Sequence, residues 1–372
     1  MYHVKTMNKI SKIGLAELDD RFEISDTMEH EDAILVRSAK LHDYDFPAEL
    51  LCIARAGAGV NNIPLDRAAE AGIVVFNTPG ANANGVKELT IAALLLASRK
   101  ISQGITWVKE QAAAGADVAA VVEKGKAAYV GPEIQGKTLG VVGLGAIGVL
   151  VANAAAALGM QIVGYDPFLS VQHALNLTPG VKVVSTLEEL YGQADYISLH
   201  LPMTPETKGT LNDAAFAAMK DGVRIVNLAR GELVDTEALK AALASGKCAA
   251  YVTDFPNSET AAMEGVVAIP HLGASTPESE ENCAVMAARQ LQDYLVNGNI
   301  RNSVNLPNLE QEWSGISRLC LIHKNVPAML TNIMSTLSND GINVENMTNK
   351  SKKDYAYTIV DVNTRITDQV AN

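Results

Sequence analysis

The stretch KTLGVVGLGAIGVLVANAAAALGMQIVGYD, residues 137–166, decides the fold of this chain. An apolar run that ends at Val142 is typical of a buried parallel strand. Gly143, Gly145 and Gly148 follow it with the spacing G-x-G-x-x-G, and the residues after them are apolar at helical length. Strand, glycine turn and helix together predict a βαβ nucleotide-binding unit.

Each of the three glycines has its own physical task in such a unit. Gly143 permits the tight turn from strand to helix, Gly145 lets a pyrophosphate approach the backbone, and Gly148 lets the helix pack closely on the sheet. The free N–H groups at the helix start favour phosphate charge. Position 146 is Ala, so the contact with phosphate must come from the backbone. The alternative is that the glycines serve close packing alone.

An acidic residue completes the unit. The apolar run 161–165 ends in Asp166, which lies 18 residues after the last glycine. A carboxylate there can accept hydrogen bonds from both hydroxyls of a ribose and repels a 2′-phosphate, so the sequence predicts NAD rather than NADP.

Length and composition limit the classes of function. A chain of 372 residues is long enough for two or three domains, and 48% hydrophobic with 19% charged residues is typical of globular proteins. A net charge of −12 and a pI near 5.1 argue against broad binding to nucleic acid or to anionic membranes. An anionic substrate would therefore need a local cationic pocket.

The cysteines and the apolar runs indicate the compartment. The four cysteines, at 52, 248, 283 and 320, form no C-x-x-C pair, so neither a zinc site nor a disulfide framework is expected. The first residues lack the apolar core of a signal peptide, and no run of about 18 apolar residues occurs. We therefore expect a cytoplasmic protein.

The chain outside the βαβ unit divides into segments. Residues 1–97 carry short strand and helix signals, as in AILVRS and GIVVFNTPG, and Arg55 lies at the end of the strand LLCIA. Ligands of open α/β sheets collect at such strand ends, although Arg55 could equally be a paired surface residue. Residues 84–110 read as one long helix. Five further strands are expected, at 181–185, 195–202, 223–230, 251–255 and 266–270, which makes a doubly wound parallel sheet.

Ionisable residues follow three of these strands. Arg230 closes VRIVNLAR, Glu259 lies in TDFPNSE, and His271 follows Pro270. Arginine can bind a carboxylate bidentately, histidine can exchange the proton of a hydroxyl, and glutamate can fix the tautomer of a histidine. Together they predict a hydride-transfer site, although a single histidine near a buried strand is often only structural. His200 is a weaker candidate that lines the cofactor crevice, and no catalytic metal is expected.

Five motifs in this order resemble the D-isomer-specific 2-hydroxyacid dehydrogenases: GLGAIG with its acid, SLHLPMTPETKG, IVNLARGELVD, DFPNSE and PHLGAST. The resemblance implies a flavodoxin-like, discontinuous substrate-binding domain (1–97 and 282–303), a Rossmann NAD-binding domain (98–281), a linker (304–315) and a small tail domain (316–372). By motif, Arg230, Glu259 and His271 take the catalytic roles, with Glu264 as the alternative glutamate. Arg55, with Arg230 and His271, would hold the substrate.

The resemblance also implies the cofactor contacts. Besides the three glycines they would fall on Thr78, Ala146, Ile147, Asp166, Leu228, Ala229, Asp254 and Gly273.

The tail, from Arg318 onward, resembles the beginning of an ACT domain, an α+β regulatory fold that binds amino acids such as serine at subunit interfaces. Asn325, Pro327 and the turn 339–343 carry this likeness. The final helix and strand of that fold are missing, so we expect an incomplete sheet, covered by another subunit or poorly ordered, and weak or absent inhibition by serine.

The resemblance, with such a tail, implies oxidation of 3-phospho-D-glycerate at the entry to L-serine biosynthesis. It also implies a homodimer or homotetramer. The alternatives are another hydroxyacid (glycerate, lactate or 2-hydroxyglutarate) and an NADH-sensing interaction protein without turnover.

Overall fold

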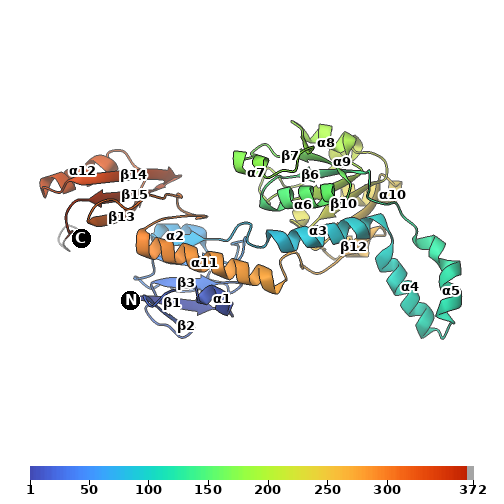
Figure 1. Ribbon diagram of the computed structural model, residues 1–372, viewed down its shortest axis with the longest axis horizontal. Helices are drawn as coiled ribbons and strands as arrows, with labels where there is room; N and C mark the ends of the chain where they lie inside the picture. Colours follow the sequence, from blue (N-terminus) through green and yellow to red (C-terminus); the bar gives the residue numbers. More distant parts are fainter. Residues whose placement is uncertain (367–372) are drawn as a thin grey trace. The chain divides into compact units, whose positions relative to one another are not determined.

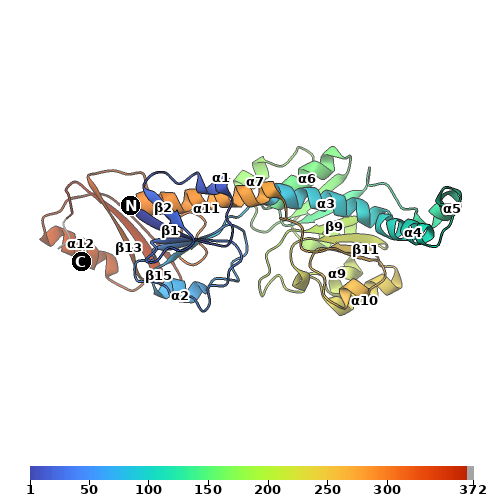
Figure 2. The same ribbon diagram turned by 90° about the horizontal axis from the view of Figure 1, so that it is seen from below.

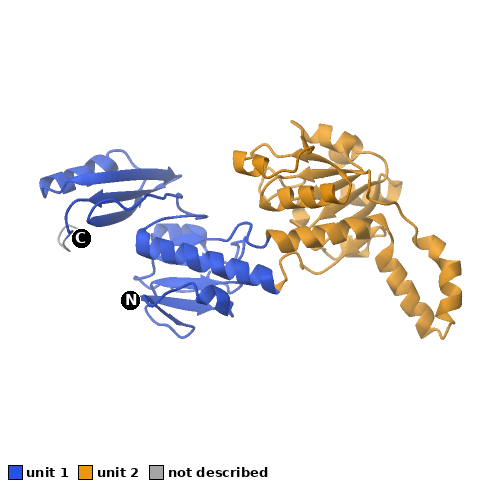
Figure 3. Ribbon diagram, in the orientation of Figure 1, with its two compact units in different colours: residues 1–82, 277–372 blue, residues 83–276 orange. Residues whose placement is uncertain are grey.

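The structure is a computed structural model that describes residues 1–366, and the chain forms two compact units (Figure 3). Unit 1 comprises Met1–Asn82 with Pro277–Asn372, and unit 2 comprises Ala83–Thr276. The division therefore falls at 82/83 and 276/277, whereas the sequence placed it at 97/98 and 281/282. The helix that begins at Ala83 belongs to unit 2 because its apolar side, with Val86 and Leu94, packs into the core of that unit.

Unit 2 is built on a seven-stranded sheet in which every pairing is parallel, with the order β12-β11-β10-β9-β6-β7-β8. Counted from β6, this is the dinucleotide-binding order with one strand added, and the order reverses between β6 and β9. The strands are β6 (Thr138–Val142), β7 (Gln161–Tyr165), β8 (Lys182–Val183), β9 (Tyr196–Leu199), β10 (Val223–Asn227), β11 (Cys248–Thr253) and β12 (Val266–Ala268). The predicted Rossmann domain is confirmed.

Helices cover both faces of this sheet. In Figure 2, α3 and α6 lie on one side of it and α9 and α10 on the other. Successive side chains of β6 point to opposite faces of the sheet. Val141 packs with α3 and α6, and Val142 packs with α8, α9 and α10. The helices are α3 (Ala83–Ser98), α6 (Ala146–Ala157), α7 (Val171–Leu175), α8 (Leu187–Gln193), α9 (Asp213–Ala218) and α10 (Thr236–Ser245), with 3₁₀ turns η2 (Gly231–Leu233) and η3 (Thr260–Ala262).

The single helix predicted over 84–110 is wrong, because the chain breaks after Ser98. The Ser98 hydroxyl bonds back to Leu94 O and to the hydroxyl of Tyr196. A later segment also crosses here, since a Cβ on Gly131 would lie 2.0 Å from Ser98 O. Beyond the break, α4 (Ile101–Ala113) and α5 (Val118–Gly125), followed by η1 (Lys126–Tyr129), form a hairpin that leaves the sheet (Figure 1).

The first part of unit 1 holds a five-stranded parallel sheet with the order β2-β1-β3-β4-β5, the flavodoxin-like order that the resemblance implied. Helices α1 and α11 cover one face and α2 the other (Figure 2). The elements are β1 (Tyr2–Met7), α1 (Lys12–Leu15), β2 (Phe22–Ser25), β3 (Ala33–Val36), β4 (Cys52–Arg55), α2 (Leu65–Glu70), β5 (Val74–Phe76) and α11 (Pro277–Asn297).

The tail forms a small antiparallel sheet with the order β13-β15-β14 and one helix. Its elements are β13 (Ser317–Lys324), α12 (Met329–Asn339), β14 (Val344–Lys352) and β15 (Tyr355–Val362). Val360 packs beneath α12, whereas Tyr357 and Ile359 join the core of the five-stranded sheet. The predicted α+β tail is thus present, and its last residues, 367–372, lie outside the described part.

Within residues 1–366, none of the helices combines the length and the apolar character needed to cross a bilayer.

Candidate active site

The glycine turn lies at the carboxyl end of β6, beside the point where the strand order reverses. Gly143 has φ +92°, and a Cβ on it would lie 2.6 Å from His200 O at the end of β9. Gly148 lies against the turn, since a Cβ there would come within 1.9 Å of Gly143 O. Gly145 caps α6, and a Cβ on it would meet no atom within 4 Å. The backbone N–H groups after Gly145 are therefore accessible to an anion.

Asp166 follows β7 at the same edge of the sheet. One carboxylate oxygen accepts the N–H of Leu144 at 2.8 Å, and the other accepts the N–H of Phe168 at 2.8 Å. Two backbone donors therefore fix the carboxylate beside the glycine turn. Each oxygen keeps a lone pair that can accept a hydrogen bond from a ribose hydroxyl.

The loop after β10 carries Leu228, Ala229 and Arg230, and Asn227 shapes it. The buried Asn227 amide accepts the N–H groups of Ala229 (3.2 Å) and Arg230 (3.3 Å) and donates to Arg230 O (2.8 Å). It also donates to the Tyr251 hydroxyl at 3.0 Å. Sequence reasoning missed Asn227, although a polar residue at the end of a buried strand is itself a signal.

Arg230 and His271 both contact one aromatic ring. The guanidinium carbon of Arg230 is 5.2 Å from the centre of the Phe255 ring. The His271 ring lies 4.3 Å from the same ring, tilted by 46°. The structure thus brings the predicted arginine and histidine to one site, through a residue that sequence reasoning did not select.

Asp254 is buried directly before Phe255. One of its oxygens accepts the N–H of Gly273 at 3.0 Å, and the other has no hydrogen-bond partner among residues 1–366. Burial raises the pKa of Asp254, while the Gly273 N–H and the nearby His271 act in the opposite direction. A buried acceptor without a donor is costly, and such an atom is suited to a donor on a ligand.

Glu259 does not contact His271 in the described chain. Its carboxylate lies 3.2 Å from Lys240 Nζ, and its side chain is 47% exposed. Glu264, the alternative glutamate, is exposed as well. The expected hydrogen bond between a glutamate and the His271 ring is therefore absent from residues 1–366, and the catalytic role of Glu259 stays a prediction.

His200 ends β9 opposite the glycine turn. Its ring Nε2 lies 2.9 Å from Ser198 Oγ, and burial lowers its pKa to about 4. The ring is therefore neutral at pH 7, which suits a residue that lines a cofactor crevice better than one that carries charge.

Unit 1 contributes a separate cationic group. The Arg55 guanidinium folds over its own loop, since a Cβ on Gly57 would lie 2.1 Å from Arg55 Nη1. Arg37, directly after β3, pairs with Glu280 at 2.6 Å. Burial raises the pKa of Cys283, and the positive charges of Arg55 and Arg37 oppose that rise, so both cations lie near this thiol. Thr78 is buried and its hydroxyl lies beside the Cys283 thiol.

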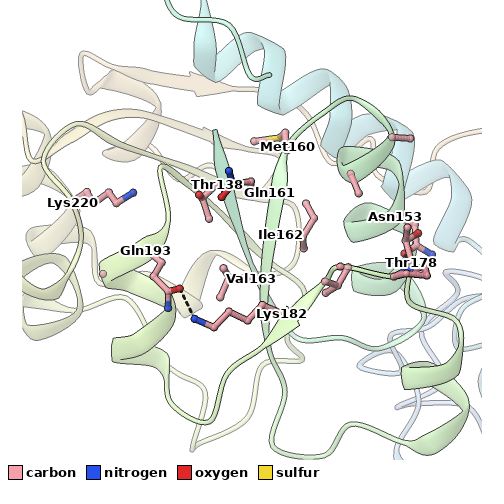
Figure 4. Close-up of a pocket in the computed structure, with 16 residues that line it drawn as sticks. Thr138, Asn153, Met160, Gln161, Ile162, Val163, Thr178, Lys182, Gln193 and Lys220 are labelled. Atoms are coloured by element: carbon pink, nitrogen blue, oxygen red, sulfur yellow. Dashed lines mark hydrogen bonds between the residues drawn. The ribbon is translucent and has the colours of Figure 1, made fainter. Parts of the chain in front are cut away.

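A pocket of about 870 Å³ lies at the opposite edge of the unit 2 sheet (Figure 4). Thr138, Gln161 and Lys182 line it, and these are the first residues of β6, β7 and β8. Because the glycine turn and Asp166 follow the last residues of β6 and β7, this pocket is not the cofactor site.

Comparison with known proteins agrees with this geometry. A family model described as the NAD-binding domain of D-isomer-specific 2-hydroxyacid dehydrogenases matches residues 91–273. D-3-phosphoglycerate dehydrogenase of Methanocaldococcus jannaschii is 34% identical in an alignment of 349 residues that covers 91% of this chain and 64% of that protein.

Two solved structures are similar in fold. NAD⁺-bound 3-phosphoglycerate dehydrogenase of Entamoeba histolytica has a TM-score of 0.62 and 27% identity, covering 82% of this chain and 98% of that one. A glyoxylate reductase from Paecilomyes thermophila has a TM-score of 0.66 and 28% identity, with the same coverage. The chain spans only 52% to 64% of the length of the curated relatives it matches.

Proposed function

Because this chain, through its NAD-binding domain, is a member of the D-isomer-specific 2-hydroxyacid dehydrogenase family, we propose that it oxidises 3-phospho-D-glycerate to 3-phosphohydroxypyruvate with NAD. This reaction begins L-serine biosynthesis. The observation that carries the proposal is the pair of Arg230 and His271 around Phe255, at the same edge of the sheet as the glycine turn.

The residues at this edge fit a dinucleotide. The open backbone after Gly145 suits a pyrophosphate, and the fixed carboxylate of Asp166 suits a ribose. The unpartnered oxygen of Asp254 suits an N–H donor such as a carboxamide. The surrounding wall consists of Gly143, Ala146, Ile147, Gly148, Leu228, Ala229 and Gly273. Thr78, which belongs to unit 1, stays a predicted cofactor contact.

Bound NAD supplies the hydride acceptor of the reaction. The Arg230 guanidinium is suited to bind the substrate carboxylate and to polarise the oxygen on the neighbouring carbon. His271 then takes the hydroxyl proton when the alcohol is oxidised and returns it when the ketone is reduced. The ring nitrogens of His271 make no hydrogen bond within residues 1–366, so they are accessible to a substrate hydroxyl.

Arg37 and Arg55 support a phosphorylated substrate. Both lie at the carboxyl end of the unit 1 sheet, near Cys283, in a chain whose net charge is −12. Two guanidinium groups in so acidic a protein are suited to a phosphate, which accepts bidentate hydrogen bonds and would compete with Glu280 for Arg37. Sequence reasoning found Arg55 and missed Arg37.

The glyoxylate reductase likeness favours a second candidate, reduction of a small unphosphorylated 2-oxoacid. It differs from the first proposal in substrate and keeps the same roles for Arg230 and His271. The position of Arg37 and Arg55 is what favours the phosphorylated acid.

The deciding experiment is NADH oxidation by the purified protein with 3-phosphohydroxypyruvate, hydroxypyruvate, pyruvate and 2-oxoglutarate. We expect kcat/KM for the phosphorylated acid to exceed the others by about 10²-fold, since hydrogen bonds to charged groups contribute about 1.5–3 kcal/mol each. The control His271→Gln should bind NADH and lose turnover by about 10²-fold or more. A preference for an unphosphorylated acid would select the second candidate, and no turnover with intact NADH binding would favour a sensor.

We further propose that the protein works as a homodimer or homotetramer and that the tail takes an amino-acid effector. The association is supported by the α4–α5 hairpin, which has no buried residue. The effector is supported by the β13-α12-β14-β15 arrangement of the described tail.

A further inference from the structure

We propose that Phe255 is a positioning residue, whose ring holds Arg230 and His271 in the relative orientation that hydride transfer needs. The inference rests on the proposed dehydrogenase function. It adds an aromatic ring to the contacts that orient His271, beside the glutamate that the motif resemblance implies.

The backbone holds Phe255 firmly. Its N–H donates to Thr253 Oγ1 at 3.0 Å, at the end of β11. Its carbonyl oxygen lies 3.1 Å from the position that a Cβ on Gly231 would occupy, so the loop after β10 packs directly against it. Phe255 therefore follows β11 and packs against the loop after β10, the strand that pairs with β11.

Both polar side chains depend on this ring for their placement. The His271 ring has no hydrogen bond within the described residues, and its ring contact is with Phe255 at 4.3 Å. Within the described part of the chain, the Arg230 guanidinium donates only to the carbonyl of its neighbour Ala229, at 2.6 Å, and it lies over the Phe255 ring at 5.2 Å. A cation over an aromatic face is attracted by the ring quadrupole, so the ring limits rotation of the guanidinium.

In this structure the Phe255 ring, and not Glu259, contacts the imidazole. With its carboxylate 3.2 Å from Lys240 Nζ, Glu259 does not reach the imidazole in this structure. Packing against an aromatic ring restrains the imidazole plane and leaves both of its nitrogens open to substrate. A general acid–base residue must be oriented as well as protonated, since a small misplacement of reacting groups costs about 10²-fold in rate.

The first test compares Phe255→Leu, which removes the ring, with Phe255→Tyr, which keeps it. We expect kcat to fall by about 10- to 100-fold in Phe255→Leu while the KM for NADH stays within about 2-fold, and Phe255→Tyr to stay within about 3-fold of the unaltered protein. Phe46→Leu is the matched control, because Phe46 also packs against a guanidinium, Arg67 at 4.3 Å, in unit 1. An active Phe255→Leu, or equal losses in both Phe255 variants, would overturn the proposal.

The second test does not depend on turnover. Protein labelled with ¹³C at the histidine Cε1 gives one signal per histidine, and the His271 signal is identified as the one missing in His271→Gln. Phe255→Leu should displace that signal by loss of the ring current, while Phe255→Tyr and Phe46→Leu leave it in place. An unmoved His271 signal in Phe255→Leu would refute the contact. Absence of turnover in the unaltered protein would instead contradict the proposed dehydrogenase function.

Discussion

At the scale of one residue, we propose that Asp166 selects the dinucleotide that the protein accepts. Its two oxygens accept the N–H groups of Leu144 and Phe168, so the negative charge is fixed beside the glycine turn. A fixed carboxylate repels a 2′-phosphate and accepts from ribose hydroxyls. The same two hydrogen bonds mean that a substitution here must preserve the loop as well as change the charge.

We predict that Asp166→Asn weakens NADH binding by about 10- to 100-fold, because a hydrogen bond to a charged group contributes about 1.5–3 kcal/mol. NADPH binding should strengthen at the same time, since the repulsion is removed. Fluorescence titration with both nucleotides measures the two effects. Asp166→Ala, which removes the acceptors as well as the charge, shows how much of the loss comes from the loop. A variant that discriminates against NADPH as strongly as the unaltered protein would contradict the electrostatic argument.

At the scale of elements, the α4–α5 hairpin is the part of unit 2 that lacks a core. Neither helix has a buried residue, and Ile101, Ile105 and Val108 are 38%, 52% and 37% exposed on α4. These three positions recur at helical spacing, so they form one apolar stripe. Exposed apolar area of this kind is unfavourable in water. A second copy of the chain that packed against the stripe would bury it.

We therefore predict that Ile105→Asp shifts the protein toward monomer, because a carboxylate in an apolar interface loses its hydration without a partner. Gln103→Asp is the matched control, since residue 103 lies on the other side of the same helix. Sedimentation equilibrium over a range of concentrations gives the dissociation constant, which should rise by about 10-fold or more in the first variant only. A monomeric unaltered protein, or equal behaviour of the two variants, would refute the interface.

Local signals predicted the elements well where neighbours in sequence determine them. The sequence predicted the turn at Gly143, the acid that follows β7 and the later strands, because each depends on a few adjacent residues. The break after Ser98 was not, since it involves Gly131, which arrives from a distant part of the chain.

The same reason explains the site residues that were missed. Phe255, Asn227 and Arg37 have ordinary side chains whose roles come from partners on other strands or helices. The pairing of Glu259 with Lys240 likewise joins residues from two elements. A motif supplies the residue type, and the fold decides which partner that residue meets.

At the scale of the whole molecule, a buried ion pair within the tail sheet is the centre of the hydrogen bonds that join this sheet to the rest of unit 1. Arg318 on β13 and Asp361 on β15 pair at 2.6 Å, with side chains 2% and 0% exposed. Asp361 also accepts from Gln311 and Ser314 in the connecting segment, and Arg318 donates to Asn297 O at the end of α11. Burial alone would raise the pKa of Asp361, but the hydrogen bonds from Arg318, Ser314 and Gln311 lower it to about 2.

This depressed pKa predicts how the attachment of the tail depends on pH. The carboxyl of an unfolded aspartate titrates near about 3.9, so the stabilisation is fully present above that pH and is lost as the pH falls toward 2. Asp361→Asn should already lose it at pH 7, at a cost of about 3–5 kcal/mol, because it leaves the Arg318 charge buried without its counter-ion. Hydrogen exchange of β13, β14 and β15, followed by mass spectrometry, should show the loss there and leave unit 2 protected. Replacing both partners, Arg318→Met with Asp361→Leu, removes the unpaired charge and should restore part of the protection. Unchanged exchange in Asp361→Asn at pH 7 would show that the apolar contacts of Tyr357 and Ile359 hold the tail without the ion pair.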